Sequence, residues 1–350
     1  LQYLPYRTLK RAIRSHNARS GSIVVMDVHT GEVLAMVNQP TYNPNDRSQL
    51  AAERYRNRAI TDIFEPGSSL KPLVVAAALE SGQYRPSSII DTAPGFIVVG
   101  PKKIEDARNL GRVSLTTILA RSSNVGITKL AMTLQPDQLW ETMTHFGLGE
   151  LTTSGFPGES AGMLTHYSNW RPISQATLAY GYGVSVTPLQ LAQAYAAIGN
   201  GGQLRPVSLV ALDAPPESDQ VLSVETANAV RRMLEEVVRP GGTGTKAAVD
   251  GYRIAGKTGT AWKFATGGYS EDKYISIFAG LAPASDPRLA TVVVIDEPGG
   301  ELYYGSDVAA PVFANVMSES LRLLAVPPDA LPARDPSNVM QAMATRTENQ

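Results

Sequence analysis

Three short strings that could do chemistry together occur in one order along this chain of 350 residues. They are Ser68-Ser69-Leu70-Lys71, Ser122-Ser123-Asn124 and Lys257-Thr258-Gly259-Thr260. Together they provide a serine nucleophile, amines that could activate it, and hydroxyl and amide groups that could hold a carbonyl and a carboxylate. By chance, a chain of this length should contain roughly one Ser-x-x-Lys and one Ser-x-Asn, but fewer than about 0.1 Lys-Thr-Gly. The combination is therefore far more specific than any of its members.

The first string is typical of an activated nucleophile. Ser68 and Lys71 are three positions apart, so both lie on one side of a helix. A lysine can remove the serine proton only when it is neutral, and burial and a second cation, Lys257, both favour that form. The helix N-terminus would also direct a backbone N–H at charge that develops beside Ser68. Taken alone, the pair more often marks a helix cap followed by a solvated lysine.

A second Ser-x-x-Lys runs from Ser270 to Lys273. It lies among glycines and acidic residues, and no apolar helix follows it. We therefore predict a polar loop there and reject this copy as the catalytic one.

Ser122 and Asn124 follow a segment with helical periodicity. The Asn124 amide can donate and accept hydrogen bonds, and the Ser122 hydroxyl could relay a proton to a leaving amine. Taken alone, Ser-Ser-Asn is also ordinary turn chemistry.

The third string lies in a strand pattern. Alternation places Lys257 and Gly259 on one face and Thr258 and Thr260 on the other. Gly259 would let a ligand approach the backbone closely. An exposed edge strand without a site is the alternative interpretation.

Other catalytic chemistries find little support. Cysteine is absent, and the four histidines lie in predicted surface helices, turns or loops: His16, His29, His145 and His166. No zinc-protease motif, phosphate loop or dinucleotide fingerprint occurs, so we predict neither a metal nor a cofactor. We expect three acidic candidates to be caps or loop residues: Glu65, Asp106 and Asp296.

Composition predicts an ordinary globular protein. Hydrophobic residues make up 43% of the chain, and 31 basic residues balance 32 acidic ones, which argues against a nucleic-acid partner. The apolar runs are far shorter than the ~20 residues that span a bilayer. Because the chain opens within a predicted helix, we expect a fragment that lacks an N-terminal portion.

Hydrophobic periodicity predicts an α+β fold. Two early and three late strands imply one antiparallel sheet closed by distant parts of the chain, and hence one domain over residues 1–325. We read residues 326–350, rich in proline, as a flexible tail. The predicted strands are 22–27, 32–37, 252–262, 274–282 and 289–296. The predicted helices are 3–17, 68–80, 115–134, 136–146, 173–180, 188–198, 224–238 and 309–324.

In this order, the three strings mark the penicillin-recognising serine transpeptidases and β-lactamases. The segment 57–68, Asn-Arg-Ala-Ile-Thr-Asp-Ile-Phe-Glu-Pro-Gly-Ser, narrows this further, because it closely resembles the class B penicillin-binding proteins of septal cell division, the FtsI type (penicillin-binding protein 3). The likeness covers about residues 1–325. It also includes residues 25–27, 30–36, 41–45, 180–183 and 255–261.

The resemblance implies a five-stranded antiparallel sheet flanked by helices, with a helical subdomain and a site between the two. It further implies one N-terminal membrane helix and a non-catalytic domain, both missing here, and a catalytic domain in the bacterial periplasm. The implied partners are peptidoglycan stem peptides, β-lactam antibiotics, a septal glycosyltransferase and other divisome proteins.

The resemblance also implies a role for each site residue. Ser68 attacks the D-Ala-D-Ala carbonyl of a stem peptide, and an amine of a neighbouring stem, meso-diaminopimelate, then takes the acyl group. Lys71 would be the base, Ser122 a proton relay, Asn124 a holder of the substrate amide and Lys257 an electrostatic organiser. Thr258 and Thr260 would bind the terminal carboxylate, with the N–H groups of Ser68 and Thr260 as the oxyanion hole. Five tyrosines would line the cleft: Tyr180, Tyr182, Tyr269, Tyr303 and Tyr304.

One position departs from the family pattern. Trp262 stands two residues after Thr260, where relatives of this type usually carry Arg or Lys. Without that cation, the hydroxyls of Thr258 and Thr260 would do more of the carboxylate binding.

Two other functions share these motifs. A β-lactamase or D,D-carboxypeptidase would form the same acyl-enzyme but use water as acceptor, for which Glu141, Glu150 and Glu159 are the available carboxylates. A β-lactam-binding sensor would keep Ser-x-x-Lys without turnover.

Overall fold

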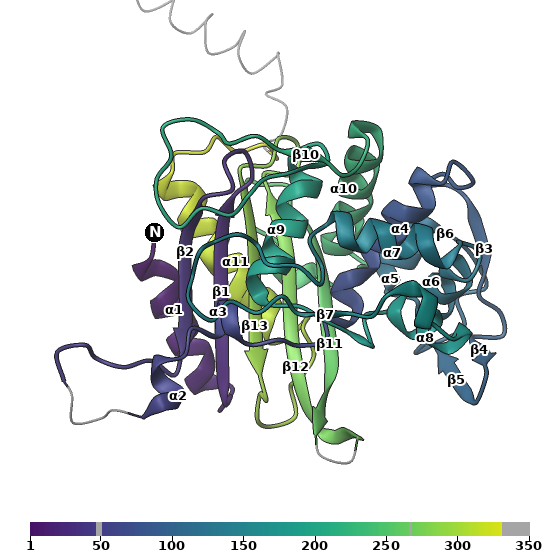
Figure 1. Ribbon diagram of the computed structural model, residues 1–350, viewed down its shortest axis with the longest axis horizontal. Helices are drawn as coiled ribbons and strands as arrows, with labels where there is room; N and C mark the ends of the chain where they lie inside the picture. The colour runs from purple at the N-terminus through teal and green to yellow at the C-terminus, as the bar shows by residue number, and fades with distance from the viewer. Residues whose placement is uncertain (47–50, 266–267, 331–350) are drawn as a thin grey trace, which may run out of the picture.

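A computed structural model describes residues 1–46, 51–265 and 268–330 (Figure 1). The central sheet contains five antiparallel strands in the order β11-β12-β13-β1-β2. Strand β1, near the start of the chain, pairs with β13, near its end, which confirms the predicted sheet and α+β class. The strand bounds are β11 (Ala255–Ala265), β12 (Gly268–Ala282), β13 (Leu289–Asp296), β1 (Ser20–Asp27) and β2 (Val33–Gln39).

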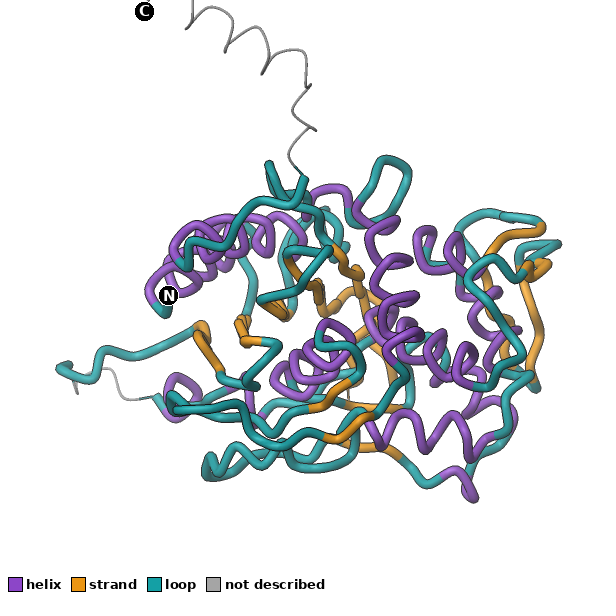
Figure 2. Tube along the Cα trace, turned by 90° about the horizontal axis from the view of Figure 1, so that it is seen from above, coloured by secondary structure: helices purple, strands orange, loops and turns teal. Residues whose placement is uncertain are grey.

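Helices cover both faces of this sheet (Figure 2). Because side chains alternate along a strand, β1 sends Ile23 and Val25 to one core and Val24 and Met26 to the other. The first core is completed by α1 (Tyr3–Ser15) and α11 (Ala309–Leu323), the second by α9 (Pro188–Gly199) and α10 (Val224–Val238).

A helical subdomain lies beside the β11 edge of the sheet (Figure 1). At its centre is α4 (Lys71–Glu80), whose residues 71–78 are all buried. Around it lie α5 (Leu115–Arg121), α6 (Asn124–Ala131), α7 (Pro136–His145) and α8 (Pro172–Leu178). The subdomain also contains four short strands: β3 (Ile89–Asp91), β4 (Phe96–Val99), β5 (Lys102–Glu105) and β6 (Arg112–Ser114).

The remaining elements are short and connect these layers. They are α2 (Ala52–Tyr55), α3 (Arg58–Thr61), η2 (Gly67–Leu70), η3 (Tyr167–Asn169), η4 (Thr245–Ala247), β7 (Met163–Leu164), β8 (Val184–Ser185), β9 (Gln203–Leu204) and β10 (Asp219–Gln220).

The structure differs from prediction at three places. The helix expected over 115–134 is two helices, broken at Ser122 and Ser123. Ser270 to Lys273 lies in strand β12 rather than in a loop, between the pairs Trp262–Tyr274 and Phe264–Tyr269, where the register of β11 and β12 shifts. Residues 266–267 lie outside the described residues. The predicted tail also begins too early. Asp329 accepts hydrogen bonds from the backbone N–H groups of Arg253 (2.7 Å) and Ser285 (3.0 Å), while residues 331–350 lie outside the described residues.

Over the described ranges, no helix combines the length and apolar character needed to cross a membrane.

Candidate active site

Ser68 lies in the 3-10 turn η2, which leads directly into α4. The turn is held from several sides. The buried Tyr195 of α9 donates its hydroxyl to the Ser69 carbonyl (2.8 Å), and the Gly67 N–H donates to the Gly181 carbonyl (3.1 Å). Gly67 has a φ of 52°, the left-handed region that glycine adopts without strain. The nucleophile is therefore presented by a turn fixed by distant segments.

Lys71 is fully buried at the start of α4. Its Nζ donates to the Ser122 carbonyl (2.6 Å), to Asn124 Oδ1 (2.7 Å) and to Ser122 Oγ (3.2 Å). Burial holds the pKa of Lys71 well below its usual value, and the charge of Lys257 lowers it further, while Asp106 opposes the shift. A neutral amine next to the nucleophilic turn can act as a base.

Ser122 stands between the two site lysines. Its Oγ lies 3.2 Å from Lys71 Nζ and 3.0 Å from Lys257 Nζ. Its φ of 57° is left-handed, which is uncommon for a residue with a side chain and is typical of functional sites. This conformation ends α5 and turns both the carbonyl and the hydroxyl toward amines.

Lys257 is also fully buried, and its burial lowers its pKa to about 7. Besides Ser122, its Nζ donates to the carbonyl of Thr258 (3.1 Å). The Ser122 hydroxyl therefore joins two amines, both of which are depressed in pKa by their surroundings, and it can pass a proton between them and a bound substrate.

Asp106 holds the Ser122-Ser123-Asn124 string in place. Its carboxylate accepts hydrogen bonds from Ser123 Oγ (2.5 Å) and from the backbone N–H groups of Asn124 (2.5 Å) and Val125 (3.0 Å). Asp106 thus caps α6, as predicted for this residue. Asn124, with its Oδ1 on Lys71, donates Nδ2 to the Glu105 carbonyl (3.3 Å) and lines the groove that contains Ser68.

Strand β11 is the edge of the sheet, and this edge forms one wall of the site. The Trp262 N–H donates to the Tyr182 hydroxyl (3.2 Å), away from β12. Because N–H groups of alternate residues point to the same edge, the Thr260 N–H also points away from β12. The Thr260 Oγ1 accepts a hydrogen bond from the Gly305 N–H (2.9 Å), so its own proton is available to a ligand.

The predicted alternation along β11 holds. Thr258 and Thr260 line a groove of about 450 Å³ together with Ser68, Ser122 and Asn124. Gly259 has a packing role: a Cβ there would lie 2.9 Å from the Pro66 carbonyl oxygen and 3.1 Å from the Ile277 Cβ. The missing side chain therefore makes room for the turn before Ser68.

Aromatic side chains line a second hollow, of about 250 Å³, that also contains Ser68, Asn124 and Thr260. Four predicted tyrosines lie there together with Trp262 and a residue that sequence reasoning missed, Tyr274, which stacks on Tyr303 with ring centroids 4.0 Å apart. The four are Tyr180, Tyr182, Tyr303 and Tyr304. Burial raises the pKa of Tyr180 to about 12, so its hydroxyl stays protonated.

The fifth predicted tyrosine, Tyr269, is not among the residues lining this hollow but lies behind it. Its hydroxyl donates to Glu65 Oε1 (2.9 Å), and its ring centroid lies 5.4 Å from that of Tyr182. Glu65 also accepts the Gly183 N–H (2.7 Å), and burial raises the pKa of its carboxyl group. Glu65 thus joins the hairpin of β11 and β12, the 180–183 loop and the segment that precedes Ser68.

Sequence reasoning missed several other groove residues. Arg108 and Arg121 bring cationic side chains to the groove, and Thr243 places its Oγ1 2.9 Å from that of Thr258. Arg121 could have been suspected because it directly precedes Ser122. Nothing local marks Thr243, which reaches the site through the fold.

Comparisons with known proteins agree with this geometry. Residues 21–318 match the model of the penicillin binding protein transpeptidase domain. The chain is 47% identical over 335 residues to the peptidoglycan D,D-transpeptidase FtsI of Escherichia coli K12, covering 96% of this chain and 57% of that protein. It is 40% identical over 331 residues to the probable peptidoglycan D,D-transpeptidase PbpC of Pseudomonas aeruginosa, covering 95% of this chain and 59% of that protein.

A solved structure gives the same result. The apo transpeptidase domain of Burkholderia pseudomallei penicillin-binding protein 3 superposes with a TM-score of 0.87 at 43% identity, covering 95% of this chain and 96% of that one. By contrast, this chain spans only a little over half the length of the Escherichia coli relative. The fold, the site and these matches together show that the chain belongs to the family of penicillin-binding protein transpeptidase domains.

Proposed function

We propose that this chain is the catalytic domain of a peptidoglycan D,D-transpeptidase that cross-links stem peptides at the division septum. One observation carries the proposal: a fully buried Lys71, hydrogen-bonded to Ser122 and Asn124, at the start of the helix that follows the Ser68 turn. The names of the relatives, peptidoglycan D,D-transpeptidase FtsI among them, support the reaction and the septal role.

In the first half-reaction, neutral Lys71 takes the hydroxyl proton of Ser68 while Ser68 Oγ attacks the carbonyl of the penultimate D-Ala. The backbone N–H groups of Ser68 and Thr260 stabilise the resulting oxyanion. Ser122, bonded to both lysines, delivers a proton to the leaving nitrogen and takes one from protonated Lys71, so that free D-Ala departs and Lys71 is neutral again. An ester between the stem peptide and Ser68 remains.

In the second half-reaction, an amine of a neighbouring stem attacks this ester. The amine loses a proton to Lys71, a new amide bond forms, and Ser68 regains its hydroxyl proton. The Thr258 and Thr260 hydroxyls would hold the terminal carboxylate of the donor peptide, with Lys257 behind them as a cation or neutral donor. A β-lactam ring presents a similar carbonyl and carboxylate, so it would acylate Ser68.

We further propose that the whole protein acts in the periplasm, anchored in the bacterial inner membrane by an N-terminal helix. Its partners there would be a septal glycosyltransferase and other divisome proteins. These parts of the proposal rest on the resemblance to septal relatives.

The hydrolase alternative needs a carboxylate that positions water near the acyl-enzyme. Glu141, Glu150 and Glu159 are not among the residues lining either hollow around Ser68. Glu159 is engaged elsewhere, since it accepts the Thr152 N–H (2.7 Å) and the Ser154 hydroxyl (2.7 Å). No observation favours hydrolysis.

Intact-mass spectrometry after addition of benzylpenicillin tests the proposal. We expect a stable adduct of one penicillin per chain that Ser68→Ala removes. A donor peptide ending in D-Ala-D-Ala, offered with an amine acceptor, should yield cross-linked product in excess over hydrolysed product. An adduct that disappears within seconds would support a β-lactamase instead, and acylation without any peptide turnover would support a sensor.

A further inference from the structure

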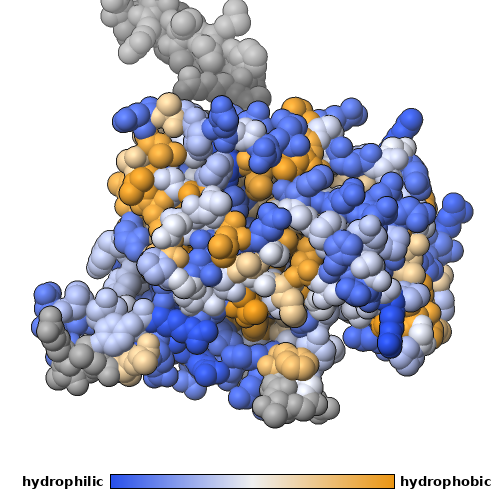
Figure 3. Space-filling view, in the orientation of Figure 1, coloured by the Kyte–Doolittle hydropathy of each residue, from blue (hydrophilic) through white to orange (hydrophobic). Residues whose placement is uncertain are grey.

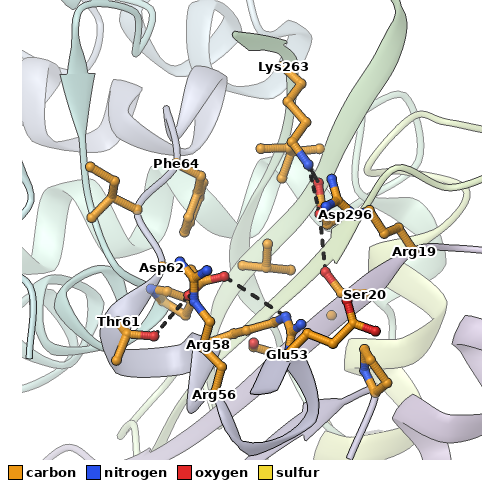
Figure 4. A pocket seen from close by; sticks show the side chains of 17 residues that line it. Arg19, Ser20, Glu53, Arg56, Arg58, Thr61, Asp62, Phe64, Lys263 and Asp296 are labelled. Atoms are coloured by element: carbon orange, nitrogen blue, oxygen red, sulfur yellow. Dashed lines mark hydrogen bonds and ion pairs between the residues drawn. The ribbon is translucent and has the colours of Figure 1, made fainter. Parts of the chain in front are cut away.

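A second cavity, separate from the Ser68 groove, lies against the sheet between the 56–64 segment and the ends of β1, β12 and β13 (Figure 4). Its volume is about 620 Å³. In Figure 3, hydrophilic residues gather in this region, between α2 at the lower left and the hairpin of β11 and β12 at the lower middle. The reaction proposed above does not use this cavity.

One wall of the cavity is an ion-pair network whose carboxylates are satisfied. Lys263 Nζ lies 2.8 Å and 2.9 Å from the two Asp296 oxygens and 2.7 Å from Glu297 Oε1. Arg19 donates Nη1 to Glu297 (2.8 Å), and side chains of this wall appear on the right of Figure 4. Both carboxylates of this wall, Asp296 and Glu297, are therefore paired with cations. Arg19 keeps further N–H donors, because a guanidinium group has five.

On the opposite wall, one of two arginines is incompletely paired. Arg56 and Arg58 share one carboxylate, Asp62, which Arg56 contacts through Nε and Arg58 approaches only to 3.9 Å. The Thr61 hydroxyl also donates a hydrogen bond to Asp62 Oδ1 (2.8 Å). The Arg58 side chain is only 12% exposed, and its Nη1 is buried without a hydrogen-bond partner within the described part of the chain.

Arg58 lacks a close charged partner, because its Nε lies 3.9 Å from Asp62, and a carboxylate bound in the cavity would supply one. With Glu297 counted, four cations are balanced by four carboxylates: Arg19, Arg56, Arg58 and Lys263 against Glu53, Asp62, Asp296 and Glu297. The cavity therefore offers an incompletely paired guanidinium group rather than a net positive charge. The remaining lining includes apolar side chains, which suit a ligand with an apolar body: Ile63, Phe64, Pro40, Pro188, Ile275 and Val294.

We propose that this cavity is a binding site for an organic carboxylate with an apolar body, such as an acylated amino acid or the end of a short peptide. Arg56 and Arg58 bind the carboxylate, and the apolar side chains that line the cavity contact the body of the ligand. The site is distinct from the carboxylate-binding hydroxyls of Thr258 and Thr260, which line the Ser68 groove instead.

The test uses the full chain and N-acetyl-L-phenylalanine, with the neutral N-acetyl-L-phenylalaninamide as its matched probe. Ser68 is first acylated with benzylpenicillin, so that the groove cannot take the probe. We expect the acid to bind at least about tenfold more tightly than the amide, which is the loss typical of a charged hydrogen-bonding partner. A crystal soaked with the acid should show its carboxylate at Arg56 and Arg58.

Arg56→Gln should weaken binding of the acid several-fold. Arg239→Gln is the matched control, because Arg239 is similarly exposed (57% against 55%) and also pairs with a single close carboxylate, but lies on the far end of α10. Both variants should still be acylated by benzylpenicillin at the normal rate, which shows that they are folded. Arg58→Lys provides a second variant at the buried position.

Three results would overturn the proposal. The first is loss of binding after acylation of Ser68, which would place the probe in the groove. The second is equal binding of acid and amide, which would leave only an apolar hollow. The third is equal affinity of the acid for the Arg56→Gln variant and for the unsubstituted protein. None of these results bears on transpeptidation, so this proposal and the proposed function fail separately.

Discussion

The chain contains Ser-x-x-Lys twice, and the two copies have opposite surroundings. Ser68 and Lys71 lie on a 3-10 turn that leads into a buried helix, and Lys71 is fully buried among neutral acceptors. Ser270 and Lys273 lie in strand β12 where its pairing with β11 shifts register, so no helix aligns the two side chains. The Lys273 side chain is 48% exposed and its Nζ lies 3.5 Å from a carboxylate of Glu297.

The difference teaches that spacing alone does not produce a nucleophile and base. On a helix, i and i+3 bring the serine and lysine to the same side, whereas on a strand they separate them. Burial then favours the neutral amine, because a lysine surrounded by protein loses the hydration that stabilises its charge. In the second copy, the Ser270 hydroxyl donates to Asp272 (2.5 Å) instead. The same four-residue pattern thus gives the proposed catalytic pair in one place and surface residues in the other.

The largest expected effect comes from removing each hydroxyl in turn. Ser68→Ala should abolish acylation by a fluorescent penicillin, because it removes the hydroxyl that would form the acyl ester. Ser270→Ala should leave the acylation rate within about twofold, as expected for a surface substitution. Gel fluorescence after labelling gives the measurement, and labelling of Ser68→Ala would contradict the assignment.

Replacing each lysine by arginine sharpens the comparison further. Lys71→Arg should lower the second-order rate of acylation by about 10²- to 10⁴-fold, since arginine keeps its proton and cannot serve as a base. Lys273→Arg retains the charge beside Glu297 and should change the rate very little. Stopped-flow acylation measures both variants, and a normal rate in Lys71→Arg would rule out Lys71 as the base.

The burial of the site lysines should also make stability depend on pH. Burial lowers the pKa of Lys257 to about 7 in the folded protein, against 10.5 for a lysine exposed to water. Between these values the unfolded chain binds more protons at this residue, so its contribution to the free energy of unfolding rises as pH increases from about 7 to 10.5. The whole effect is a few kcal/mol at most. Below pH 7 both states are protonated and the cost of burial is fully present.

Urea midpoints at several pH values between 7 and 10 measure this slope. Lys257→Met should reduce the slope, leaving the contribution of Lys71, whereas Lys273→Met, at a half-exposed position, should leave it unchanged. Equal slopes in all three proteins would mean that folding does not lower the pKa of Lys257.

The smallest expected effect concerns the hydrogen bond that holds the turn of the first Ser-x-x-Lys copy. Tyr195→Phe removes the hydrogen bond to the Ser69 carbonyl, leaves that carbonyl buried without its partner and should cost about 1–3 kcal/mol in the free energy of unfolding. Ser270→Ala, which removes an exposed hydrogen bond, should change stability by less than about 0.5 kcal/mol. Thermal or urea unfolding compares the two, and a larger loss in Ser270→Ala would reverse the comparison.

Much of the fold could be predicted because its elements are long and periodic. The helix over 224–238 and the strand over 289–296 have the predicted bounds, since their apolar residues repeat with the period of the structure they form. The break at Ser122 could not be predicted in the same way. Both flanking segments are helical, and the left-handed turn is held by Lys71 and Asp106, which lie far away in the sequence.

The candidate site divides in the same way. Its main residues were found because serine, lysine and the Lys-Thr-Gly string are chemically distinctive. Thr243 and Tyr274 were missed because only folding brings them to the groove or the aromatic hollow. The packing of Gly259 could not be foreseen either, because the Pro66 carbonyl that leaves no room for a Cβ there is brought in by the fold.

The sequence by itself determined which groups are available for chemistry, their order along the chain, and the periodic elements that carry them. Only the tertiary structure decided which Ser-x-x-Lys has a base, because the protonation of a lysine depends on how completely distant segments exclude water from it. Lys71 is fully buried against Ser122 and Asn124, about 50 positions away in the sequence, whereas Lys273 remains at the surface. The local sequence sets the types of these residues and their spacing, whereas the tertiary structure determines how far each lysine is desolvated.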